Sequence, residues 1–200
     1  MKYRVLLFWE DMIMHEITTL EYQKKHKPNI EDVLPHYLGD EALRNALDFI
    51  AYLRENKMKP SWTIHNAWKA VNKGKVLYYI RLPVYESHFK RPNQPSGTNW
   101  ERSWCVTPFL RNIDKYEHLI TDETEKKIIT DSFYGCKPYC KMVRCAEKGN
   151  PKIKITICGT ELSFYCGASM LENRSLWIVN PNAAEISCIK KFLEMEKSER

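Results

Sequence analysis

Glycine and long apolar runs are scarce in this sequence. Only 7 of its 200 residues are glycine, and neither the dinucleotide fingerprint GxGxxG nor a Walker-type phosphate loop occurs. The GxSxG and HExxH signatures of hydrolases and zinc proteases are also absent. Charged residues at Arg4, Glu10 and Asp11 interrupt the most apolar stretch, which falls well short of the roughly 20 residues that span a bilayer. The sequence therefore offers no standard catalytic motif and no membrane anchor.

The start of the chain, "MKYRVLLFWEDM", does not resemble a secretory signal, because its apolar run is short and no small-residue cleavage site follows. We therefore expect a cytoplasmic protein. Met12 and Met14 follow within a few residues and offer alternative starts of translation. Residues 1–14 can therefore also be interpreted as an extension upstream of the true start. A reducing compartment keeps thiols free, and an odd total of seven cysteines excludes complete disulfide pairing within the chain.

Hydrophobic periodicity predicts helices and antiparallel strands in the first half of the chain. The segment "NIEDVLPHYLG" predicts a short helix, and Asp40 is expected to cap a second one that ends near Lys57. The apolar stripe of that second helix is Leu43, Leu47, Ile50 and Leu53. In "SWTIHNAWKAVNKGKVLYYIRLP" two β-rich runs flank the turn "NKGK", which predicts a hairpin with Gly74 in its turn. A polar loop at 86–99 and a third strand at "RSWCVTPF" are expected next.

The second half of the chain begins with a predicted helix over about 122–132. Asp122 is expected to cap it, while Glu125 reaches back to the backbone amide of the cap residue. "KIKITICGTELSFYC" predicts a second hairpin around Gly159, and "SLWIVN" predicts a further strand.

A terminal helix completes the predicted set of elements. Asn180 is expected to cap it, with Pro181 in the first helical position. Its buried stripe is Ile189, Phe192 and Leu193. The order of all these elements predicts an α+β fold, with antiparallel sheets packed against helices in two hairpin-then-helix units. We expect a core domain over residues 1–132 and a cysteine-containing subdomain of hairpin and terminal helix over 133–200.

The core segments "SWTIHNAWKAVNKGKVLYYIRLP", "SWCVTPFL" and "YEHLITDETEKKI" resemble the small bacterial families of YdhG-like or YjbR-like type. The tail, with its cysteine cluster, "ICGTELSF" and "NPNAAEISCIKKFLEME", resembles one found in uncharacterised clostridial and other gut bacterial proteins. Together these resemblances cover most of residues 30–197. They imply a shared arrangement of helices, a lysine-glycine-lysine hairpin and a strand leading to a helix, and they bring no catalytic residues.

Three cysteines lie close together in "FYGCKPYCKMVRC". Cys136, Cys140 and Cys145, joined by Cys166 from the end of the second hairpin, would provide four thiolates for a tetrahedral Zn²⁺ site. Three and then four residues separate the first three cysteines, whereas the proteins that the tail resembles have more compact CxxC pairs. A structural zinc site is the most specific chemical hypothesis for this cluster.

Two other interpretations of the cysteines stay open. Six lysines and arginines outnumber a single glutamate between residues 137 and 154, and such a field lowers thiol pKa values and favours redox reactivity. No thioredoxin-like CxxC motif is present, however. Free cysteine also packs as a small apolar side chain. We expect this of Cys105 and Cys158 in predicted strands and of Cys188 in the terminal helix.

Six aromatic residues fall on or beside the first predicted sheet: Trp62, Trp68, Tyr78, Tyr79, Trp100 and Trp104. Strand alternation places some of them on the core face and others on the opposite face. Trp62, Trp68, Tyr78 and Trp104 are the candidates for a pocket that binds a small aromatic or cationic ligand under the 86–99 loop. Core packing is the alternative, since aromatic residues are common in strands.

The overall charge does not point to nucleic acid. The net charge is +6 and the pI is about 8.8, but no nucleic-acid-binding motif accompanies them. His65 and His118 are the histidines expected nearest a pocket, and neither has an evident carboxylate or nucleophile partner. We expect a non-enzymatic binding or accessory module with a structural zinc site, whose partner is a small molecule or a protein. The alternative is a small-ligand-binding protein that uses the aromatic pocket on the first sheet.

Overall fold

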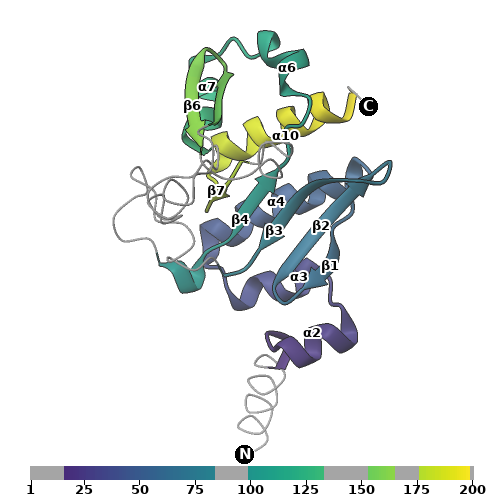
Figure 1. Cartoon of the computed structure of the whole chain (residues 1–200). Helices are drawn as coiled ribbons and strands as arrows, with labels where there is room; N and C mark the ends of the chain where they lie inside the picture. Colours follow the sequence, from purple (N-terminus) through teal and green to yellow (C-terminus); the bar gives the residue numbers. More distant parts are fainter. Residues whose placement is uncertain (1–15, 84–98, 133–152, 165–175, 199–200) are drawn as a thin grey trace, which may run out of the picture.

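A five-stranded antiparallel sheet is the centre of the structure (Figure 1). The computed structural model describes residues 16–83, 99–132, 153–164 and 176–198. In these residues the fold is α+β, with six α-helices, the five-stranded sheet and a separate two-stranded hairpin. The predicted fold class is therefore confirmed. No described helix has the length and apolar character needed to cross a membrane.

The strands of the main sheet are ordered β1-β2-β3-β4-β7, and each neighbouring pair is antiparallel. Their bounds are β1 Ser61–Ile64, β2 Ala67–Asn72, β3 Lys75–Arg81, β4 Cys105–Pro108 and β7 Ile178–Val179. The predicted turn at Gly74 is confirmed, and this glycine has a φ of 77°. The run before that turn forms two strands rather than one. Asn66, with a φ of 54°, supplies the left-handed residue that joins β1 to β2, a conformation that asparagine tolerates better than most residues.

The described residues form six α-helices, some of which cover one face of the sheet. Their bounds are α2 Leu20–His26, α3 Ile30–Val33, α4 Asp40–Glu55, α6 Ile113–Tyr116, α7 Glu123–Ser132 and α10 Ala183–Ser198. Short 3-10 turns occur at Leu34–His36, Trp100–Arg102 and Glu117–Leu119. In Figure 1, α3 and α4 lie behind the sheet and α10 runs close to α4. Residues of these three helices share one buried core with β2, β3, β4 and β7.

Helix α4 begins and ends slightly differently from the prediction. Gly39 is its N-cap, and Asp40 is the first helical residue, where its negative charge still favours the positive end of the helix dipole. The helix ends at Glu55. Leu47 is 38% exposed, while Ala46 and Phe49 are fully buried, so the stripe that contacts the sheet is rotated relative to the predicted one.

The cap of α7 is confirmed in part. The backbone N–H of Glu125 donates to Asp122 Oδ1 at 3.0 Å, as expected of a capping residue. The Glu125 carboxylate, however, accepts from Lys191 Nζ on α10 at 2.6 Å. It therefore joins two helices, whereas the sequence predicted a contact with the backbone of its own helix.

The second hairpin is confirmed as a separate sheet of β5 (Ile153–Ile157) and β6 (Thr160–Phe164). Its turn consists of Cys158 and Gly159, with φ values of 50° and 77°. Cys158 thus lies in the turn, and its expected place inside a strand is wrong. The reason is the two-residue loop, which needs positive φ at both positions.

The terminal helix starts two residues later than predicted. Asn182 Oδ1 accepts from the backbone N–H of Glu185 at 3.0 Å, and Glu185 Oε2 accepts from the N–H of Asn182 at 2.9 Å. This reciprocal pair is a capping box. Asn180, the predicted cap, instead accepts from the backbone N–H of Trp104 through its Oδ1. The predicted stripe of Ile189, Phe192 and Leu193 is confirmed as fully buried.

The last strand and helix belong to the same core as the first half of the chain. β7 pairs with β4, and the hydroxyl of Tyr52 on α4 donates to Glu194 Oε1 on α10 at 2.6 Å. Lys190 Nζ and Asp48 Oδ2 form a second link between these helices at 2.6 Å. The described residues do not show two hairpin-then-helix units, and the boundary at residue 132 stays a prediction.

Candidate functional site

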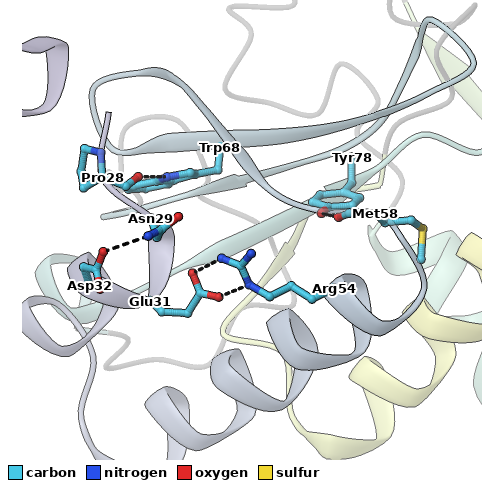
Figure 2. A network of polar contacts seen from close by, with 8 residues as sticks. All are labelled: Pro28, Asn29, Glu31, Asp32, Arg54, Met58, Trp68 and Tyr78. Carbon is cyan, nitrogen blue, oxygen red and sulfur yellow. Dashed lines mark hydrogen bonds and ion pairs between the residues drawn. The ribbon is translucent and has the colours of Figure 1, made fainter. Parts of the chain in front are cut away.

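The four aromatic residues predicted to bind a ligand lie on the helix-covered face. Trp68, Tyr78 and Trp104 have no exposed surface, and Trp62 is half-buried against the same core. Trp68 Nε1 donates to Pro28 O at 3.0 Å, and the Tyr78 hydroxyl donates to Met58 O at 2.6 Å (Figure 2). Burial raises the pKa of Tyr78, so its hydroxyl remains a donor. Core packing accounts for these contacts, and ligand binding by the four residues stays a prediction.

Cys136, Cys140, Cys145 and Cys166 lie outside the described residues, so the zinc site also stays a prediction. Of the cysteines within the described ranges, Cys105 and Cys188 are buried and Cys158 is half-buried. Burial raises the pKa of the Cys158 and Cys188 thiols, and nearby carboxylates add to the effect. Protonated thiols are poor nucleophiles, which agrees with the expected packing role.

The two histidines singled out from the sequence are both exposed. His65 Nε2 lies 2.8 Å from Thr18 O, a contact that helps to fix the segment before α2 against the β1–β2 turn. No carboxylate hydrogen bond to either ring is present among the described residues.

A more unusual set of side chains lies on the opposite face of the sheet. The strand register places the following residues together there: Ala67, Lys69, Tyr79, Arg81, Cys105, Thr107 and Val179. We call this surface the far face. It contains two cations and no carboxylate among these register positions. Its residues are not part of the core that the helices form with the other face.

Arg81, at the end of β3, is the central residue of the far face. Its guanidinium carbon lies 5.6 Å from the ring centroid of Tyr79 and 5.4 Å from that of Trp177. Both distances fall within the range of a cation–π contact. Arg81 Nε is buried and donates to no acceptor, and none of the ion pairs in the described part of the chain involves Arg81.

An arginine without an anionic partner in such surroundings is unfavourable. Leaving a buried donor unsatisfied costs about 1–3 kcal/mol, and more when the group is charged. By comparison, Arg54 on the other side of the sheet donates through Nη2 to Glu31 Oε2 at 2.8 Å, and its Nε donates to Glu31 Oε1 (Figure 2). Among the described residues, Arg54 is therefore neutralised by Glu31, whereas Arg81 has no anionic partner.

Aromatic rings extend the surface around Arg81. Phe109 packs edge-to-face against Tyr79, with ring centroids 5.7 Å apart at 87°. The guanidinium carbon of Arg111 lies 4.8 Å from the Phe109 ring centroid, and its Nη1 donates to Val76 O at 2.5 Å. Arg111 is thus held by the backbone of β3, which distinguishes it from Arg81.

Burial changes sharply across the far face. Cys105 is fully buried and Thr107 is 3% exposed, and Cys105 forms a small apolar cluster with Trp177 and Val179. Tyr79, Arg81 and Trp177 are half-buried. Arg81 therefore stands at the edge of an apolar region, where solvent screening is reduced and an ionic contact is stronger than in water.

Part of the far face could have been found from the sequence. Alternation along "VLYYIR" places Tyr79 and Arg81 on the side opposite Tyr78. Trp177 and Phe109 join them only because β4 pairs with both β3 and β7, and no local pattern indicates that pairing.

A shallow hollow of about 410 Å³ lies elsewhere, between α4 and α10. Its lining includes Arg44, Asp48, Ile186 and Lys190. Asp48 pairs with Lys190, which leaves only the charge of Arg44 uncompensated among these lining residues. Arg44 is exposed, so water screens its interaction with an anion. This hollow is a weaker candidate than the far face.

No protein-family model, curated protein or solved structure matches this chain. The bacterial family resemblance seen in the sequence therefore stays a prediction.

Proposed function

We propose that the protein is a binding module for a small anionic ligand, which it holds on the far face of the sheet through Arg81. The observation that carries this proposal is the half-buried guanidinium with a buried, unsatisfied Nε beside two aromatic rings. Because Nε itself is enclosed by protein, an incoming carboxylate or phosphate would accept hydrogen bonds from the terminal guanidinium nitrogens and would supply the missing negative charge. Hydrogen bonds to charged groups contribute roughly 1.5–3 kcal/mol.

The remaining charges of this surface favour the same kind of ligand. Lys69 lies directly opposite Tyr79 in the strand register, which places it diagonally from Arg81, where residues are typically about 7–8 Å apart. With no carboxylate at the register positions of the far face, the local field attracts anions. The proposal develops the small-ligand hypothesis from the sequence, with the binding residues moved to the other face of the sheet.

The structural zinc site is a separate proposal about the cysteine cluster. Four thiolates in a tetrahedral arrangement would stabilise the tail, and the basic residues around the cluster would compensate their charge. It does not depend on the far face, and the two can operate in one protein.

Thermal unfolding in the presence of simple anions tests the binding proposal. A ligand that binds only the folded state raises the midpoint of unfolding as its concentration rises. We expect sodium benzoate and sodium phosphate to raise the midpoint more than sodium chloride does at equal ionic strength. Arg81→Met should remove this difference.

Arg44→Met is the matched control, since it removes the same charge from an exposed position on α4. This variant should keep the full response to benzoate and phosphate. The proposal is wrong if neither anion exceeds chloride, or if Arg81→Met responds as the wild type does.

A further inference from the structure

We infer that the anion bound through Arg81 is a phosphate group with two negative charges, and that Lys69 provides its second positive contact. The inference rests on the proposed function and adds the charge and the chemical class of the ligand. It follows from the register positions of the two cations and from the place of the Arg81 guanidinium.

The two cations of the far face lie on either side of one residue, Tyr79. Tyr79 pairs directly with Lys69 in the register of β2 and β3. It is also the nearest residue of β3 that shares a face with Arg81, and the guanidinium carbon lies 5.6 Å from the centroid of its ring. The charged end of Arg81 is therefore placed beside the residue that stands opposite Lys69.

The space for a ligand lies on this side of Arg81. Its two register partners, Ala67 on β2 and Cys105 on β4, are 3% and 0% exposed, and Arg81 Nε is enclosed as well. Lys69 and Tyr79, by contrast, are only half-buried. A ligand that reaches the terminal nitrogens of Arg81 is therefore expected over these two residues, where the phenol hydroxyl is a further hydrogen-bond donor.

Two cations on one face favour a ligand with two negative charges. Like Arg81, Lys69 takes part in none of the ion pairs that the described ranges contain. Diagonal neighbours in a sheet are typically about 7–8 Å apart, which allows two long side chains to meet at one anion. Arginine binds phosphate through a two-pronged fork and lysine binds it as a point charge. A carboxylate would neutralise one of the two cations, whereas a phosphate dianion neutralises both.

Titrations of the full-length protein with four anions test the inference. Sulfate and methanesulfonate are both tetrahedral, but sulfate carries two negative charges and methanesulfonate carries one. Glycerol 3-phosphate and inorganic phosphate are the phosphate probes; at about pH 8 a phosphate ester carries two charges, because its second pKa is about 6. The amide shift of Tyr79 in ¹⁵N NMR spectra, recorded at constant ionic strength, gives each dissociation constant.

We expect sulfate and both phosphate probes to bind roughly fivefold more tightly than methanesulfonate, because the second charge gains one partly exposed ion pair. The tighter of the two phosphate probes identifies the source of the phosphate group, an ester or the free ion.

Variants of Lys69 test the origin of the preference for two charges. Lys69→Met should abolish the preference for sulfate over methanesulfonate, and Lys69→Arg, which keeps the charge, should retain it. Lys75→Met is the matched control, because Lys75 is an exposed lysine at the end of β3 opposite to Arg81; it should keep the full preference. Circular dichroism should show the same fold in all three variants.

The outcomes separate failure of the ligand class from failure of the site. Equal affinities for sulfate and methanesulfonate would overturn the inference and leave the Arg81 site intact, as would a preference that survives in Lys69→Met or is lost equally in Lys75→Met. Absence of binding by all four anions, or binding that persists in Arg81→Met, would overturn the proposed function itself.

Discussion

Replacing Arg81 with methionine should leave the stability of the protein nearly unchanged, because we propose that this side chain binds a ligand and does not stabilise the fold. Two cation–π contacts would be lost, at about 0.5–1 kcal/mol each. Removing a buried, unsatisfied Nε would return about 1–3 kcal/mol. The two effects oppose each other, so the free energy of unfolding should change by less than about 1 kcal/mol. Methionine keeps the unbranched apolar stem in contact with the aromatic rings.

Arg54→Met is the matched comparison, since it removes an arginine whose partner is present. The side chains of Arg54 and Glu31 are 34% and 27% exposed, which places the pair between surface pairs worth about 0.2–1 kcal/mol and buried pairs whose disruption costs about 3–5 kcal/mol. We expect a loss of about 2 kcal/mol in the free energy of unfolding.

Urea unfolding followed by circular dichroism measures both variants, and an unchanged m-value would show that the unfolded state is comparable. If Arg81→Met lost as much stability as Arg54→Met, Arg81 would be a structural residue, and its assignment to ligand binding would be wrong.

Three further predictions concern other parts of the chain. Gln23 has no exposed surface; it accepts from the Asn66 backbone N–H at 2.8 Å and donates to Asn66 Oδ1 at 2.6 Å. Gln23→Ala should therefore lower the free energy of unfolding, measured in urea, by roughly 2–4 kcal/mol. A loss below about 0.5 kcal/mol would contradict a stabilising role for these hydrogen bonds. Partial burial raises the pKa of Glu31, but hydrogen bonds from Arg54 outweigh this effect and hold the pKa below its ordinary value of 4.5. As the pH falls, the unfolded chain therefore binds a proton at Glu31 before the folded protein does, and the free energy of unfolding should decrease below pH 4.5. Glu31→Gln should flatten that pH dependence. An unaltered pH profile in Glu31→Gln would show that other groups dominate. Elemental mass spectrometry should find stoichiometric zinc that Cys140→Ser removes and Cys158→Ser retains, whereas metal-free wild-type protein would eliminate the zinc proposal.

Local signals account for the parts of the fold that were predicted well. The turn at Gly74 needs positive φ, and Asp122 precedes a helix whose first N–H groups need an acceptor. Both requirements are met by residues within a few positions of one another. Sequence patterns therefore suffice to locate these elements, although not always their first residue.

The errors arise where distant segments compete for a residue. Asn180 resembles a helix cap, but it lies beside β4 and accepts from the Trp104 backbone, so Asn182 caps the helix in its place. Asn66 looks like part of a strand, yet the contacts with buried Gln23 favour a turn. Such choices depend on tertiary packing, which local propensity does not contain.

The same limitation applies to the candidate site. Alternation divides Tyr78 from Tyr79, but it does not tell which of the two faces the helices cover. The burial of Trp68, Tyr78 and Trp104 follows from the packing of α4 and α10 against their side of the sheet. Only after that assignment does Arg81 stand out as an arginine that lies beside aromatic rings and has no anionic partner among the described residues.

The most direct test of the account is to follow the Nε–H resonance of Arg81 by ¹⁵N NMR while benzoate is added. The resonance is assigned by its loss in Arg81→Met. We predict a saturable shift of this signal, with Arg54 Nε–H unchanged because Glu31 already occupies it. If benzoate leaves the Arg81 signal in place, or shifts all arginine signals alike, Arg81 is not an anion-binding residue and the central claim fails.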